Sequence, residues 1–119
     1  MNSDEQATKG NIFISHRAIS TIAYHAALES YGLVGLAPQN LAAGLANVIV
    51  KDPMLGVNVD FDGKNVEIDL YIIVEYGTRI ASVANSVAEN VSYQIESLTN
   101  LNVSKVNVHV RGLRISNPD

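Results

Sequence analysis

Apolar and polar residues alternate most clearly in the middle of the chain, where they predict two adjacent β-strands. Residues 57–61 alternate, and Asp62-Gly63 follows as a dipeptide typical of type I′ hairpin turns, because both residues tolerate positive φ. Residues 66–76 then alternate without a break, and one side of this run is apolar or aromatic throughout: Val66, Ile68, Leu70, Ile72, Val74 and Tyr76. The pattern predicts a hairpin with one side in the core.

Two segments carry apolar residues at helical spacing. The first begins after Ser15, whose hydroxyl can cap a free amide of the first turn, and its stripe ends near Gly32. The second runs from Thr78, a candidate N-cap, to about Leu98, and Asn100 suits the left-handed position after it. Both segments are predicted to be amphipathic helices that cover a sheet.

Weaker patterns occupy the rest of the chain. Residues 11–14 form a short apolar run that predicts a strand, and residues 39–50 carry an apolar stripe that predicts a further helix, ended by Pro53. Residues 32–38 break the pattern, and either a short extended segment or a loop fits them. Residues 105–111 alternate and predict a last strand.

The predicted order is strand, helix, helical insert, strand, strand, helix, strand. This order is typical of an α+β two-layer domain, a split βαβ-like arrangement with helices on one face of a mainly antiparallel sheet. We expect one domain over residues 10–113, a disordered arm at 1–9 and a frayed tail at 114–119. A right-handed crossover through the last helix places the final strand parallel to strand 66–76, either beside it or one strand away.

Composition narrows the class of protein. The chain has 119 residues, of which 47% are hydrophobic and 17% charged, which suits one cored domain. It has no cysteine, so disulfides and cysteine-ligated zinc are excluded, and its net charge of −4 argues against nucleic acid as a partner. No apolar run approaches the roughly 20 residues of a membrane span, and no signal peptide is evident. We therefore expect a cytoplasmic protein without direct membrane insertion.

Candidate chemistry is sparse. His16 and His25 are nine residues apart on one predicted helix and therefore point to opposite sides, while His109 is alone on its strand. The serines fall mostly at helix caps or on helix surfaces, and no nucleophile-elbow, Walker or dinucleotide-binding motif is present. We expect no catalytic residue, no metal and no cofactor, and hence no enzyme.

One short motif offers an alternative function. Gly32-Leu33-Val34-Gly35 matches the GxxG pattern with which KH domains approach an RNA backbone. That use requires bare amides beside basic residues, whereas no Lys or Arg occurs between Tyr31 and Val50. A KH-like RNA-binding module using the Gly32 to Gly35 loop is therefore the alternative, and not the leading, interpretation.

The side of the sheet opposite the apolar row is a candidate protein-interaction face. It combines two bulky groups with acidic residues from the hairpin and basic residues from the last strand: Asp69, Tyr71, Ile73, Glu75, Lys105, His109 and Arg111. Aromatic and aliphatic groups supply area to bury, and opposite charges steer the approach of a partner. A solvated sheet face, or coverage by the helical insert, would explain the same residues without a partner.

Three stretches form a distinctive set: GxIxIS at 10–15, VEIDLYIIVEYG at 66–77 and VNVHVxG at 106–112. Together they closely resemble the alkaline shock protein (YloU-like) family of Gram-positive bacteria, and the likeness extends from about Gly10 to Leu113. The chain departs from the family pattern at His16-Arg17, where acidic residues are common, and residues 32–53 match only loosely.

The resemblance implies a small cytoplasmic protein of the envelope stress response with no established catalytic residues. Some relatives self-associate and are held beneath the membrane by a separate membrane-anchored partner. We therefore expect a non-enzymatic scaffold or partner-docking domain that forms a homo-oligomer, associated with the membrane, if at all, through a partner protein.

Overall fold

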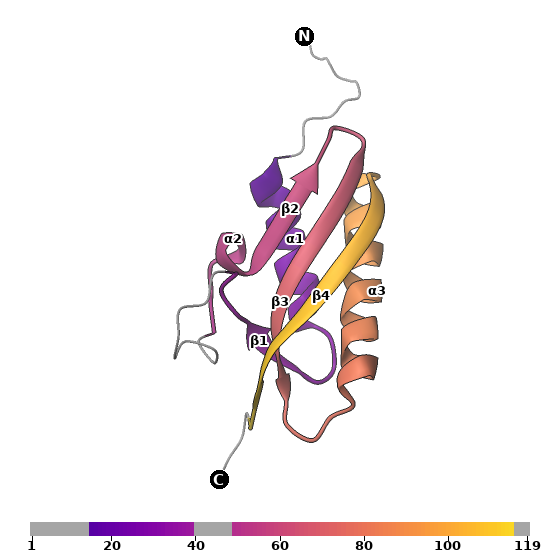
Figure 1. The fold of residues 1–119 in the computed structure, drawn as a ribbon. Coiled ribbons are helices and arrows are strands. Elements are labelled where there is room, and N and C mark those ends of the chain that lie inside the picture. Colours follow the sequence, from indigo (N-terminus) through magenta and orange to yellow (C-terminus); the bar gives the residue numbers. More distant parts are fainter. Residues whose placement is uncertain (1–14, 40–48, 116–119) are drawn as a thin grey trace.

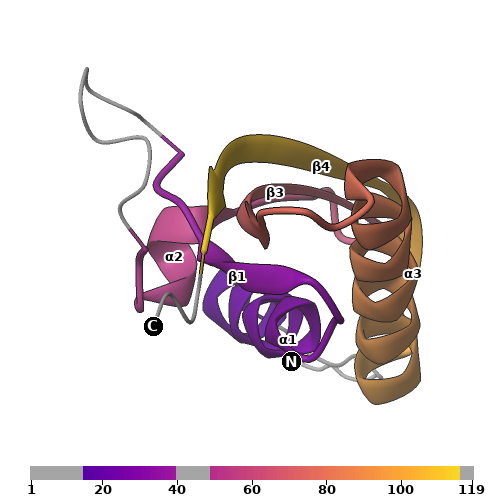
Figure 2. The same ribbon diagram turned by 90° about the horizontal axis from the view of Figure 1, so that it is seen from below.

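The computed structural model describes residues 15–39 and 49–115, which form the predicted α+β two-layer fold (Figure 1). In chain order the elements are α1 (His16–Leu28), β1 (Leu33–Leu36), α2 (Pro53–Gly56), β2 (Val57–Phe61), β3 (Asn65–Glu75), α3 (Ile80–Thr99) and β4 (Asn102–Arg114). The two long helices α1 and α3 lie on the same face of the sheet (Figure 2). The predicted strand at 11–14 and the predicted arm at 1–9 lie outside the described residues.

The central strand is β3, which pairs with all three other strands. β4 runs parallel to it along its whole length, while β2 and β1 pair antiparallel with its first and second halves. Since a strand has two edges, β2 and β1 share the edge opposite β4. Two of the three pairings are therefore antiparallel, and the final strand lies directly beside β3, which resolves the choice that the sequence left open.

The core lies between β3 and the two long helices. The inward row of β3 is completely buried: Val66, Ile68, Leu70, Ile72 and Val74. Ile19 of α1 and Val87 of α3 pack against it, and burial of each such side chain contributes about 1.5–3 kcal/mol. Tyr76, which the alternation placed in this row, is 65% exposed because β3 ends at Glu75 and the chain turns away.

Two of the predicted helix caps are confirmed, but α1 ends at Leu28, with Glu29 as its C-cap, and not at Gly32. The Ser15 hydroxyl accepts a hydrogen bond from the Ala18 amide at 3.0 Å, and Asn100 ends α3 in the left-handed region at φ 64°. The prediction that Thr78 caps α3 is wrong: Arg79 occupies the N-cap position without a side-chain bond. The Thr78 hydroxyl donates instead to the Glu75 carbonyl at 2.7 Å and stabilises the turn before the helix.

The β2–β3 hairpin is confirmed, but its turn is not type I′. Gly63 has φ 96°, whereas no other residue of the turn has positive φ. The Asp62 carboxylate accepts hydrogen bonds from the amides of Lys64 (2.9 Å) and Asn65 (2.8 Å). The side chain therefore closes the loop as an Asx turn, which does not require positive φ at Asp62.

Between β1 and β2 the structure differs from the predicted insert. Most of the predicted helix at 39–50 lies outside the described residues. Val50, at the end of that segment, is described, and it forms an antiparallel bridge with Leu36. Asp52 is extended, as a residue before proline should be, but Pro53 begins the short α2 and does not simply end a helix. The Asp52 carboxylate accepts from the Met54 amide at 3.0 Å and caps this turn.

The C-terminal strand is longer than predicted. β4 continues to Arg114, whose carbonyl accepts a hydrogen bond from the Tyr76 amide at 2.8 Å, so Arg114 belongs to the sheet and not to a frayed tail. Residues 116–119 of that predicted tail lie outside the described part of the chain. Within residues 15–39 and 49–115, no helix is both long and apolar enough to cross a membrane.

Candidate functional site

The candidate site is the face of β3 and β4 that points away from α1 and α3. Figure 2 shows both long helices on the other side of these strands. The parallel register sets Glu67 opposite Lys105, Asp69 opposite Asn107 and Tyr71 opposite His109. The acidic row of β3 and the basic row of β4 therefore lie side by side: alternation puts both rows on one face, and the strand pairing makes them neighbours.

Tyr71 is at the centre of this face. Its ring stacks on the His109 ring with centroids 4.7 Å apart and an interplanar angle of 12°. The guanidinium carbon of Arg111 lies 4.8 Å from the centroid of the same Tyr71 ring. Stacking and the cation–π contact each contribute about 0.5–1 kcal/mol at an exposed site. We call Asp69, Tyr71, Asn107, His109 and Arg111 the Tyr71 cluster.

Hydrogen bonds fix the polar members of the cluster. The Asp69 carboxylate lies 3.1 Å from His109 Nε2 and accepts from Asn107 Nδ2 at 3.1 Å, while the same Asn107 amide donates to Glu67 at 3.2 Å. Partial burial acts to raise the pKa of Asp69, but hydrogen bonds from His109, Asn107 and Asn58 outweigh it and hold that pKa below its ordinary value. Asp69 is therefore held as a carboxylate between its neighbours.

The prediction that Ile73 is exposed on this face is wrong, because Ile73 is 0% exposed. It pairs with Gly35 of β1, so the side-chain positions of these two residues share one face. A Cβ atom at Gly35 would lie 2.8 Å from Ile49 Cγ2, which places Ile49 over that face. Ile49 thus covers the Ile73 end of the face.

The other predicted residues divide between the two ends. Lys105 is exposed at one end, opposite Glu67. Glu75 is half-buried at the other end, beyond Ile73, and pairs in register with Arg114. The structure therefore brings Asp69, Tyr71, His109 and Arg111 together and leaves Lys105 and Glu75 at the margins.

Two polar residues that the sequence did not single out support the cluster. Asn107 bridges two carboxylates, and Asn58 reaches Asp69 from the neighbouring strand β2. Both occupy polar positions in alternating strands. Their role depends on the registers between β2, β3 and β4, and no signal in the sequence fixes those registers.

The remaining candidate chemistry is placed elsewhere. His16 and His25 make ring contacts with Phe61 and Tyr24 respectively. No cluster of three or more potential metal ligands occurs among the residues that the structure describes. Three of the four residues of the GxxG motif lie in β1, which pairs with β3, so the motif does not form the loop that an RNA-binding KH domain uses.

Comparison with known proteins gives the family. The model of the alkaline shock protein family, which is described by a "cell envelope-related function", matches residues 4–115. The uncharacterized protein YloU of Bacillus subtilis is 41% identical over 111 residues, which span 92% of each chain. A stress response regulator gls24 homolog of Streptococcus pyogenes is 32% identical over 108 residues, covering 87% of this chain and 59% of that protein. These matches confirm the resemblance read from the three motifs.

Solved structures confirm the fold. The variant structure "MamM-CTD H264A" superimposes with a TM-score of 0.52 and covers 82% of this chain and 98% of that chain. Its sequence identity is 13%, so the similarity concerns the architecture alone.

Proposed function

The chain belongs to the alkaline shock protein family, whose function is related to the cell envelope, and on this premise we propose that it is a non-enzymatic, self-associating scaffold or partner-docking domain of the envelope stress response. The observation that carries the proposal is the contact of the Tyr71 ring with both His109 and Arg111 on a sheet face away from the long helices. Its stress-response relatives support the biological setting.

The Tyr71 cluster has the chemistry of a docking surface. Tyr and Arg are enriched where protein interfaces are centred, because each combines a broad flat group with a polar end. Here the stack and the hydrogen bonds to Asp69 already fix the side chains. Less conformational entropy is then lost when a partner binds, which favours association.

Charge arrangement favours a second copy of the chain as one partner. Glu67 and Asp69 form an acidic row on β3, and Lys105, His109 and Arg111 form a basic row beside it on β4. A two-fold axis that lies in the plane of the contact, along the strands and between the two rows, would place the acidic row of one copy against the basic row of the other. Such an isologous contact pairs opposite charges twice.

We place the protein in the cytoplasm, with membrane association through a membrane-anchored partner protein. The same face would then either close a homo-oligomer or receive that partner. The Asp69 carboxylate and the His109 ring engage each other and Tyr71, so we assign them to surface organisation and not to proton transfer.

Light scattering across a concentration series tests the proposal. Arg111→Glu should lower the apparent mass, because it removes the cation over Tyr71 and reverses one charge of the basic row. The matched control is Arg17→Glu, at an exposed position on α1, which should keep the wild-type mass. Equal masses for wild type and Arg111→Glu at every concentration would remove the Tyr71 cluster as the self-association surface.

A further inference from the structure

The outer edge of β4 is a second feature with binding potential. Among residues 15–39 and 49–115, β4 pairs with β3 alone, so its other edge carries backbone N–H and C=O groups without a strand partner. Its register with β3 shifts between Val103 and Lys105 and again between Val110 and Gly112. The regular stretch 105–110 is long enough for a short added strand, and the bulges at its ends oppose further growth of the sheet.

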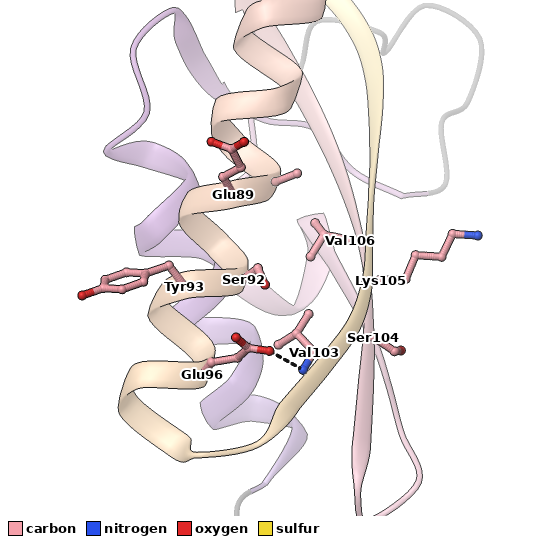
Figure 3. Close-up of a pocket in the computed structure, with 9 residues that line it drawn as sticks. Glu89, Ser92, Tyr93, Glu96, Val103, Ser104, Lys105 and Val106 are labelled. Atoms are coloured by element: carbon pink, nitrogen blue, oxygen red, sulfur yellow. Dashed lines mark hydrogen bonds between the residues drawn. The ribbon is translucent and has the colours of Figure 1, made fainter.

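A groove of about 430 Å³ lies between this strand and α3. Figure 3 shows Ser92 of α3 on one side, Val103 and Val106 of β4 pointing toward the helix, and Lys105 pointing away from it. At one end the Val103 amide donates to the Glu96 carboxylate at 3.0 Å. An amide of β4 is thus already bonded to a carboxylate oxygen from outside the sheet.

The apolar row of β4 is incompletely covered. Val106 and Val108 are half-buried and Val110 is 38% exposed, whereas the equivalent row of β3 is completely buried. A strand added beside β4 would place its own alternate side chains next to these valines and in the groove. Burial of this apolar surface would favour the added strand.

Charge indicates which strand would fit. On the inner edge, β3 presents carboxylates to the polar row of β4: Glu67 lies opposite Lys105, and Asp69 contacts His109 at 3.1 Å. An added strand with carboxylates at alternate positions would meet the same side chains from the other edge. A second β4 would instead bring Lys105, His109 and Arg111 against like charges.

The helix side of the groove carries negative charge, in contrast to the basic residues of β4. Glu89 and Glu96 line it, so acidic side chains of an added strand would be repelled there. Carboxylates are therefore favoured on the Lys105 side, and apolar residues on the groove side. Because side chains alternate along a strand, this selects one of the two possible registers.

From these observations we propose that the edge of β4 and the α3–β4 groove bind, by strand addition, an extended segment of another protein in which acidic residues alternate with apolar residues. Apolar side chains enter the groove beside Val103 and Val106, and carboxylates lie near Lys105 and His109. The site uses the backbone edge of the sheet and shares only the His109 side chain with the Tyr71 cluster.

Fluorescence anisotropy with two labelled synthetic peptides tests the proposal. One has the sequence of residues 65–71, the segment that β4 already accepts on its inner edge. The other carries the changes Glu67→Lys and Asp69→Lys. We expect the acidic peptide to bind the full chain at least about 10-fold more tightly, a difference of about 1.4 kcal/mol. Lys105→Glu should reduce or invert this preference.

Matched variants of α3 locate the peptide. Ser92→Trp fills the groove and should weaken binding at least about 10-fold. Ser97→Trp, at an exposed position of the same helix outside the groove, should leave it unchanged. Bound acidic peptide should also slow amide hydrogen exchange in residues 105–110. Equal affinity for both peptides, or wild-type affinity in Ser92→Trp, would overturn the proposal.

The two proposed surfaces can fail separately. Tyr71→Ser should lower the apparent mass in light scattering and retain peptide binding, whereas Ser92→Trp should lose peptide binding and retain the wild-type mass. Loss of peptide binding in Tyr71→Ser, in a protein with unchanged circular dichroism, would place the peptide on the Tyr71 cluster and contradict strand addition.

Discussion

The rings of Tyr71 and His109 stack with their centroids 4.7 Å apart and their planes 12° from parallel. The two residues are directly opposite each other in the parallel register of β3 and β4. Their contact therefore joins the hairpin to the last strand of the chain on the face away from the long helices. It also holds Tyr71 in the orientation in which Arg111 covers it.

Removal of the Tyr71 ring should measurably destabilise the fold. Tyr71→Leu loses the stack on His109 and the contact with Arg111 while keeping an apolar side chain, so we expect the free energy of unfolding to fall by about 1–2 kcal/mol. Urea denaturation measures this change. Tyr31→Leu is the matched control, because Tyr31 is 86% exposed. Equal losses in the two variants would contradict a structural role of the stack.

Ile73 should behave as a core residue although it lies on the side of β3 opposite the main core. Ile73→Ala removes a side chain that is 0% exposed, so we expect a loss of about 2–5 kcal/mol in the free energy of unfolding. Ile80→Ala, at a position that is 41% exposed, should cost much less. A small, equal loss in both would mean that Ile73 is not covered in solution.

The case of Ile73 shows what alternation can and cannot predict. The pattern of residues 66–76 correctly assigns Ile73 to the side opposite Ile72 and Val74. Coverage of that side depends on the path of the chain after β1, which brings Ile49 over Gly35. The position of Ile49 is a tertiary feature, so alternation within residues 66–76 could not predict it.

The strands and long helices could be predicted because their periodicity persists over many residues. The position of β4 could not, since a right-handed crossover allows a direct neighbour or a strand one place away. The role of Asn107 depends on that position, because it bridges Glu67 and Asp69 only when β4 lies beside β3. The sequence could therefore name most members of the Tyr71 cluster without predicting their contacts.

Acid should destabilise the protein partly through Asp69. Its pKa is lowered in the folded state from the ordinary value of 3.8, so its contribution to stability is fully present above that value. The contribution is lost as the pH falls through the lower, folded-state pKa. Urea unfolding from about pH 6 to about pH 2.5 should show a shallower loss of stability for Asp69→Asn than for wild type.

A second carboxylate provides an internal comparison. The pKa of Asp62 is also lowered, by hydrogen bonds from the backbone amides of Asn65 and then Lys64. Asp62→Asn should therefore also make the loss of stability at low pH shallower. The double variant should make it shallower still, since the two residues lie at separate sites. If both single variants lose stability at low pH as steeply as wild type, these assignments are contradicted.

Charge exchange between Glu67 and Lys105 tests the proposed pairing of acidic and basic rows between two copies. These residues are direct neighbours across β3 and β4. Lys105→Glu alone puts a negative charge in the basic row, and Glu67→Lys alone puts a positive charge in the acidic row. Each single variant should therefore lower the apparent mass in light scattering. The double variant restores one charge of each sign on the face and should recover much of the wild-type mass.

Exposed ion pairs contribute about 1 kcal/mol or less each, so the series should be run at low salt and repeated at high salt, where all four proteins should converge. Two outcomes would show that opposed charge rows do not join the copies. In one, a folded double variant does not recover the wild-type mass; in the other, the single variants keep that mass at low salt.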